Sequence, residues 1–169
     1  MSFLPSEYKE PENINGYMKL IEGNNSFRIL SSAIVGWEYW TKDKKPVRSK
    51  TPFEETPNIK KNPKTGQDEP VKEFWAFVVF NYHVGKIQIL EITQKTIKSG
   101  IQSLIDNPKW GDIFKYDVVI TKTVTGDKTT YQVIAEPPVG ETKESIVEEY
   151  KGMKINLEAL YDGKDPFSE

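Results

Sequence analysis

The residues with the clearest binding chemistry are three large aromatic side chains within four positions, Trp37, Tyr39 and Trp40. They lead directly into a loop whose cationic residues are Lys42, Lys44, Lys45, Arg48 and Lys50. Flat rings beside positive charge can bind single-stranded nucleic acid, because bases stack on the rings while phosphates contact the cations. The alternative interpretation is a core strand that leads into a solvated loop.

Residues 73–82 form the strongest expected strand, because they are rich in β-branched and aromatic side chains. Side chains alternate between the two faces of a strand, so the even-numbered positions from 74 to 80 make an unbroken apolar face that we expect to be core. The other face carries Trp75 and Phe77 and ends in the polar Asn81. Two large aromatics outside the core face predict a second binding surface, unless both faces are covered.

Both strands therefore supply candidates for binding single-stranded DNA. The stacking candidates are Trp37, Tyr39, Trp40, Trp75 and Phe77. The candidates for phosphate contacts are Arg28, Lys42, Lys44, Lys45, Arg48 and Lys50. Trp37 and Tyr39 share one face of their strand while Trp40 takes the other, so one of these faces must be core. We expect the first pair to line the groove, with the loop at 42–50 closing over the strand.

The composition disfavours most catalytic chemistry. Cysteine is absent and His83 is the single histidine, which excludes disulfides, thiol catalysis and metal sites built from these residue types. A carboxylate metal site would need Asp106, Asp112 and Asp117, but turn and capping roles explain these acids better. His83 falls at an expected hairpin turn, which disfavours a serine–histidine–aspartate arrangement. We therefore expect no enzyme activity and no cofactor.

The charge is distributed unevenly along the 169 residues, although the net charge is only −2. Residues 42–72 hold nine Lys and Arg against five acids, whereas residues 141–169 hold four Lys against eight acids. This asymmetry predicts a local anion-binding surface and an acidic tail. No apolar run is long enough for a membrane-spanning helix, and the acids and prolines near the N-terminus do not resemble a secretory signal. We expect a cytoplasmic protein without a membrane partner.

The hydrophobic pattern predicts mostly strands. The expected strands cover 27–30, 36–40, 73–82, 86–91, 115–122 and 129–135. A polar loop punctuated by prolines covers 41–72. Thr93 is expected to cap a helix whose apolar stripe consists of Ile97, Ile101, Leu104 and Ile105. A second helix is expected after Pro138 and ends at Gly152.

This order predicts a mainly β protein with a minor α component. A five- or six-stranded antiparallel barrel with one helix before its last two strands is the OB-fold arrangement, whose sheet face and loops bind oligonucleotides. Other small barrels fit the pattern almost as well. We expect residues 1–140 to form the OB-fold domain, and residues 141–169 to add a C-terminal helix and an acidic tail.

Four segments resemble the single-stranded DNA-binding proteins of tailed phages. They read LPSEYKEP…YMKL, FRILSSAIVGWEYW, FWAFVVFNYHVGKIQILEITQKTI and YDVVITKTVTGDKTTYQVIAEPP. The resemblance is close to small phage proteins of this group and distant to the T4-type helix-destabilising protein. The distant resemblance rests mainly on the strand with Arg28, on the strand that contains Phe74, Trp75 and Ala76, and on the helix that follows.

The resemblance implies an OB-fold that coats single-stranded DNA in replication and recombination without base specificity. The zinc-binding insertion of the T4-type protein cannot form here, because the required cysteines and histidines are missing. The family's acidic C-terminal segment contacts replication proteins and competes with DNA. Asp162, Asp165 and Glu169 around Pro166 and Phe167 weakly resemble the acidic, aromatic tip of bacterial single-strand binders.

The alternative from another class is a structural or adaptor β-barrel, either a virion component or a protein-binding module. Such a protein would use the same exposed aromatics to bind a protein partner. Stacking and phosphate contacts serve DNA and RNA alike, and the pattern predicts no particular oligomeric state.

Overall fold

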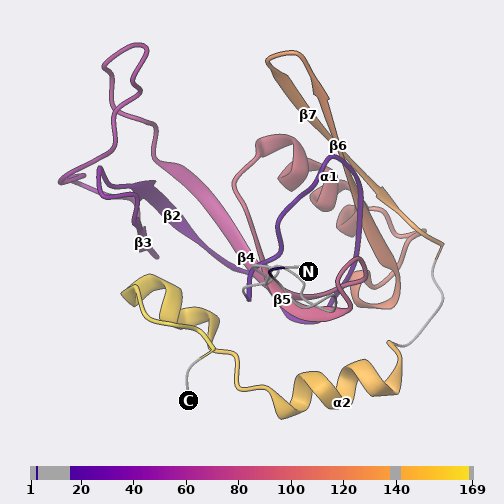
Figure 1. Ribbon diagram of the computed structural model, residues 1–169. Coiled ribbons are helices and arrows are strands. Elements are labelled where there is room, and N and C mark those ends of the chain that lie inside the picture. Colours follow the sequence, from indigo (N-terminus) through magenta and orange to yellow (C-terminus); the bar gives the residue numbers. More distant parts are fainter. Residues whose placement is uncertain (1–2, 4–15, 138–141, 168–169) are drawn as a thin grey trace.

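The computed structural model describes residues 3, 16–137 and 142–167 of the chain (Figure 1). The first segment of the phage resemblance, at 4–11, and the expected domain boundary at 140 lie outside the described residues. The expectation of a mainly β chain is confirmed. So are a helix before the last two strands and a C-terminal helix.

The described chain contains seven strands, two α-helices and two 3-10 helices. The strands are β1 (Gly23–Ile29), β2 (Ile34–Trp40), β3 (Pro46–Ser49), β4 (Lys72–Asn81), β5 (Lys86–Ile92), β6 (Asp117–Thr125) and β7 (Lys128–Ala135). The helices are α1 (Lys95–Asp106), η1 (Ile113–Lys115), α2 (Glu144–Gly152) and η2 (Leu157–Asp162).

The long strand β4 organises the sheet. Its first half pairs with β2 and its second half with β1, whereas β5 lies along its other edge. The order is β3-β2-β4-β1-β6-β7, with β5 attached to β4 and all strand pairs antiparallel. The sheet therefore has seven strands, not the expected five or six.

The described strands form an open sheet, because no ladder joins β5 to β7. The far edge of β5 instead pairs with the segment that precedes β1. Ile89 N donates to Gly16 O at 2.8 Å, and Met18 N donates to Ile89 O at 2.9 Å. This segment occupies part of the β5 edge at which further strand pairing would be needed to close a barrel.

The strand β3 is an addition to the sequence-based expectation, which treated 41–72 as one loop. It pairs with β2 from Trp37 opposite Ser49 to Trp40 opposite Pro46. Proline is tolerated there because β3 is an edge strand. Two isolated bridges, Thr41 with Ile59 and Lys61 with Asp68, give the rest of the loop further backbone pairing.

One hydrophobic core lies between the sheet and α1. It contains Phe27, Phe77 and Val79 from the sheet and Ile97 and Ile101 from the helix. The helix begins one residue later than expected, with Gln94 instead of Thr93 as its N-cap. The expectation that Ile105 belongs to the buried stripe of this helix was wrong, because Ile105 is 49% exposed.

A second core lies on the opposite face of β4 and β5, beneath the C-terminal segment. Phe74, Ala76 and Val78 are buried there together with Leu160 from η2. Tyr161 OH donates to Val35 O at 2.6 Å and attaches η2 to β2. The even-numbered face of β4 is thus core as expected, and the C-terminal segment is part of the folded unit.

No helix among the described residues is both long and apolar enough to span a membrane.

Candidate nucleic-acid interface

Trp37 and Trp75 come together on one face of the sheet. In the β2–β4 ladder Trp37 pairs with Glu73 and Val35 pairs with Trp75. Residues directly opposite each other in a ladder point to the same side of the sheet. Trp37 and Trp75 therefore share one side as diagonal neighbours, and the Cα atoms of such neighbours are typically about 7–8 Å apart in an antiparallel pair. Both are partly exposed. We call this pair the tryptophan platform.

A groove runs from the platform to the start of α1. It measures ≈ 500 Å³ and is lined by Glu73, Trp75, Lys95, Lys98, Ser99 and Gln102. Trp75 Nε1 donates to Glu73 Oε1 at 3.3 Å. Lys98 Nζ donates to Glu73 O at 3.0 Å and lies 3.6 Å from Glu73 Oε1. One acid and two lysines leave the groove with a net positive charge.

Two of the expected stacking residues are buried, which corrects the sequence-based prediction. Phe77 is 3% exposed and packs in the core beneath α1. Tyr39 is also 3% exposed, because Phe53 packs edge-on against its ring and its hydroxyl donates to Pro57 O. Trp37 therefore lies in the platform without Tyr39, the partner expected for it.

Trp40 is exposed but lies on the other face of β2, away from the platform. It precedes the turn that joins β2 to β3, which carries Lys42, Lys44 and Lys45. All three lysines are exposed, and no ion pair to them is found among the described residues. This exposed turn fits the phosphate-contact expectation for the three lysines, which remains a prediction.

Arg48 differs from these lysines because it is bound to two acids. Arg48 Nε donates to Glu38 Oε2 at 3.1 Å, and Nη2 donates to Glu91 Oε2 at 2.6 Å. The guanidinium also lies 5.8 Å from the centre of the Phe74 ring. A phosphate could reach Arg48 only if both carboxylates were displaced, so the expected phosphate contact of Arg48 stays a prediction.

The same cluster contains Glu38, a glutamate whose pKa is raised above its ordinary value. Glu38 is almost fully buried. Burial and the neighbouring Glu91 raise the pKa of Glu38 to about 8, against the opposing effect of Arg48. Around neutral pH the cluster therefore holds a proton, and its charge is close to balanced. It joins β2, β3 and β5 on the face opposite the platform.

Lys50 also has an acidic partner. Its Nζ lies 2.7 Å from Glu158 Oε2 and 5.2 Å from the centre of the Tyr161 ring. Both charged side chains of the ion pair are well exposed, so the pair is labile. The acidic C-terminal segment thus contacts the basic part of the chain at one defined point.

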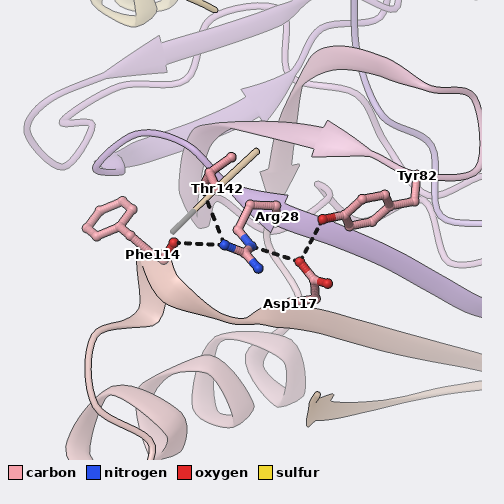
Figure 2. Close-up of polar contacts among 5 residues, drawn as sticks. All are labelled: Arg28, Tyr82, Phe114, Asp117 and Thr142. Carbon is pink, nitrogen blue, oxygen red and sulfur yellow. Dashed lines mark hydrogen bonds and ion pairs between the residues drawn. The ribbon is translucent and has the colours of Figure 1, made fainter. Parts of the chain in front are cut away.

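Arg28 is a structural residue, which corrects its expected phosphate contact (Figure 2). It is 2% exposed, and its Nε donates to Asp117 Oδ1 at 2.8 Å. Its Nη1 donates to Phe114 O and to Thr142 Oγ1, both at 3.3 Å. Tyr82 OH donates to the same Asp117 oxygen at 2.8 Å. Burial and this bond raise the pKa of Tyr82 to about 12.

The sequence-based reasoning missed Lys95 and Lys98. The signal was present in the expected hairpin, since pairing across the turn at 82–85 places Ile92 opposite Trp75. The helix starts three residues after Ile92, so its first turn must lie beside Trp75. Counting the hairpin register would have found both lysines.

Among the described residues, no group of three His, Cys, Asp or Glu side chains is placed to hold a metal ion. Comparison with known protein families, with curated proteins and with solved structures finds no match.

Proposed function

We propose that the chain binds single-stranded nucleic acid, with bases stacked on the tryptophan platform. The observation that carries the proposal is the diagonal pairing of Trp37 with Trp75, both partly exposed, on one sheet face. Stacking is tolerant of sequence, because every base has a flat face. Coating of single-stranded DNA in phage replication and recombination, the role implied by the resemblance, belongs to the same proposal.

The strand connectivity supports this proposal. An OB-fold joins its first strand to its second and fourth, and places a helix between the third and fourth. Here β1 pairs with β4 and β6, β4 with β5, and β6 with β7, while α1 lies between β5 and β6. We propose that β1, β4, β5, β6 and β7 form an open variant of this fold. Loops that bind oligonucleotides in OB-folds correspond to the connection from β1 to β4 at 30–71, which contains β2 and β3, and to the β6–β7 turn.

The distribution of cations also favours the proposal. Lys95 and Lys98 flank the platform, and Lys42, Lys44 and Lys45 extend from the end of β2. We propose that these five lysines contact phosphates. Each lost contact should reduce the slope of log affinity against log salt by about 0.7 for a single strand.

Titration of the tryptophan fluorescence with oligo-dT at low salt tests the proposal. We expect quenching that weakens steeply with salt, and we expect the substitutions W37F and W75F to remove most of it. W110F is the control, because Trp110 packs against Tyr116 in the core. No quenching of the folded wild-type protein at low salt would contradict the proposal.

A second titration tests the lysines. The triple variant K42Q/K44Q/K45Q should flatten the salt dependence by about two units if all three lysines contact phosphates. The control K86Q/K109Q/K151Q removes the same charge from other exposed positions. An equal effect of both variants would indicate general electrostatics instead of a defined path.

Exposed apolar side chains near the platform favour a protein-binding adaptor as the second candidate. Val35 lies opposite Trp75, and Ile105 and Phe114 are exposed close by. Such a surface could bind a protein partner. Binding to a protein that W75A abolishes and salt does not weaken, without binding to oligo-dT, would support the adaptor.

A further inference from the structure

An apolar pocket adjoins the tryptophan platform at Trp75. It measures ≈ 260 Å³. Its walls are Ile29, Ser31, Ser32, Ala33, Trp75, Phe77, Ile101, Ile105, Ile113 and Phe114. The aliphatic and aromatic side chains come from β1, β4, α1 and η1, and Ala33 comes from the connection between β1 and β2. Only the two serines bring side-chain hydroxyls.

The pocket is open to solvent through a rim of exposed residues. Ile105 and Phe114 are both exposed although they are large and apolar, and Ala33 is exposed beside them. The hydroxyl of Ser31 is already engaged, because it accepts from Val78 N at 2.8 Å and donates to Ser32 O at 3.0 Å. The interior therefore offers apolar contact and few hydrogen bonds.

The pocket and the platform groove share one residue. Trp75 lines both the apolar pocket and the groove that contains Lys95 and Lys98. A strand whose bases stack on the platform would thus reach the pocket at the next position past Trp75. Sites of similar or larger volume bind small ligands mainly through apolar walls.

The chemistry of the walls selects which edge of a base can enter. The hydrogen-bonding edge of any base would lose water without finding partners in the pocket, which is costly. The 5-methyl edge of thymine has no such requirement and gains from burial, by about 0.8 kcal/mol per methyl-sized group. Uracil and cytosine have the same ring shape but lack the methyl group.

The geometry points to a thymine-binding pocket at the end of the platform, into which the 5-methyl group of one base inserts. This inference rests on the proposed binding of single strands. It implies that binding is tolerant of sequence along the platform but selective at one position. It also implies a preference for DNA, in which the methylated base occurs.

Short oligo-dT and oligo-dU of equal length test the inference, because they differ only in the methyl group. We expect the wild-type protein to bind oligo-dT about fourfold more tightly, the equivalent of about 0.8 kcal/mol for one seated methyl group. Equal affinities would overturn the inference and leave the proposed function intact. Failure to bind either strand would instead contradict the proposed function.

A pocket-filling variant separates the pocket from better stacking of thymine on the tryptophans. In A33L the added side chain covers the mouth without displacing a buried group, because Ala33 is exposed. We expect A33L to bind oligo-dT and oligo-dU equally. The control S145L adds a leucine at an exposed position of α2 and should keep the fourfold preference. A preference that survives in A33L would overturn the inference.

A matched pair of rim substitutions gives a second readout. I105S removes an apolar rim residue, whereas I134S removes an equally exposed isoleucine of β7 that does not line the pocket. Only I105S should reduce the preference for oligo-dT. If the pocket instead binds an apolar side chain of a protein, neither substitution will change the ratio, and the inference fails.

Discussion

Trp37 and Trp75 are diagonal neighbours on adjacent strands, which places two partly exposed indoles on one sheet face. The relationship is fixed by backbone register, since a shift by one residue would turn one of them to the opposite face. The two rings therefore act as one surface, and their contributions to binding should not be independent.

Alanine substitutions measure this surface directly. W37A and W75A should each weaken binding of oligo-dT by about 1–3 kcal/mol, which corresponds to about 5- to 150-fold. The double variant should lose less than the sum, because neighbouring residues of one binding surface do not contribute independently. W40A, on the opposite face, should stay within about twofold of wild type. Equal losses for W40A and W37A would contradict the assignment of the face.

Phe77 should matter for folding and not for stacking. It is 3% exposed and belongs to the core shared with α1, so F77A should lower the free energy of unfolding by about 3–5 kcal/mol, as large core truncations do. Urea denaturation measures this loss. I21A at an exposed position should change stability by no more than about 0.5 kcal/mol. A stable F77A protein with weakened binding would restore Phe77 as a stacking residue.

Substitutions of Arg28 should lower the stability of the protein without changing the salt dependence of its binding. R28A leaves the Asp117 carboxylate without its buried partner, and such a loss costs about 3–5 kcal/mol. R28K should recover part of the stability, because the charge remains while the planar fork is lost. The salt slope of binding by R28A, measured where this variant is folded, should match wild type, because only a substitution that removes the charge tests a phosphate contact. A slope reduced by about 0.7 would indicate a phosphate contact.

The alternation of side chains predicted the two faces of the central strand β4, but it did not predict which elements pack over each face. The even-numbered residues of β4 form core as expected. The odd-numbered face also becomes core at Phe77, because α1 packs over it, whereas Trp75 stays partly exposed. A pattern of period two identifies two faces, whereas the element that covers each face depends on tertiary packing.

The charged residues show the same limit. Arg28 pairs with Asp117, 89 positions later in the chain, and only the β1–β6 register brings the two together. Arg48 finds Glu38 through the short strand β3, which has four residues and starts with proline. Such a segment carries too little periodicity to be recognised. The sequence therefore did not distinguish the cationic residues that have acidic partners in the structure from those that do not.

The cluster of Glu38, Glu91 and Arg48 predicts a dependence of stability on pH. An unfolded glutamate has a pKa of about 4.3, and in the folded protein the pKa of Glu38 is about 8. The folded state therefore holds one more proton within this window, and stability must fall as pH rises through it. Above the folded-state pKa of Glu38, its contribution to the free energy of unfolding is completely lost.

E38Q tests this prediction, because glutamine cannot ionise but can still accept from Arg48. The melting temperature of wild type should fall between about pH 5 and 8, by about 2–4 °C for each kcal/mol lost. E38Q should show a flatter profile. E158Q, at an exposed pair, should keep the wild-type profile, and a wild-type melting temperature that rises across this range would contradict the pKa assignment.

The C-terminal segment combines a structural role with an electrostatic one, and different variants separate them. Leu160 is buried against β4 and β5, so L160A should cost about 2–5 kcal/mol. Deletion of 158–169 would expose the same core face. Truncation therefore cannot test whether the acidic segment screens the cationic surface, since any change in affinity would be mixed with loss of folding.

Charge-neutral substitutions test screening in a folded protein. In E158Q/D162N the two exposed acids of η2 lose their charge while Leu160 stays in place. If the segment screens the interface, affinity for oligo-dT should rise severalfold at about 0.01 M salt and little at about 0.15 M, because the Debye length falls from about 30 Å to about 8 Å. E144Q/E148Q removes two exposed acids of α2 and should have a smaller effect. Equal gains from both variants would show that net charge alone, and not the contact of Glu158 with Lys50, sets the affinity.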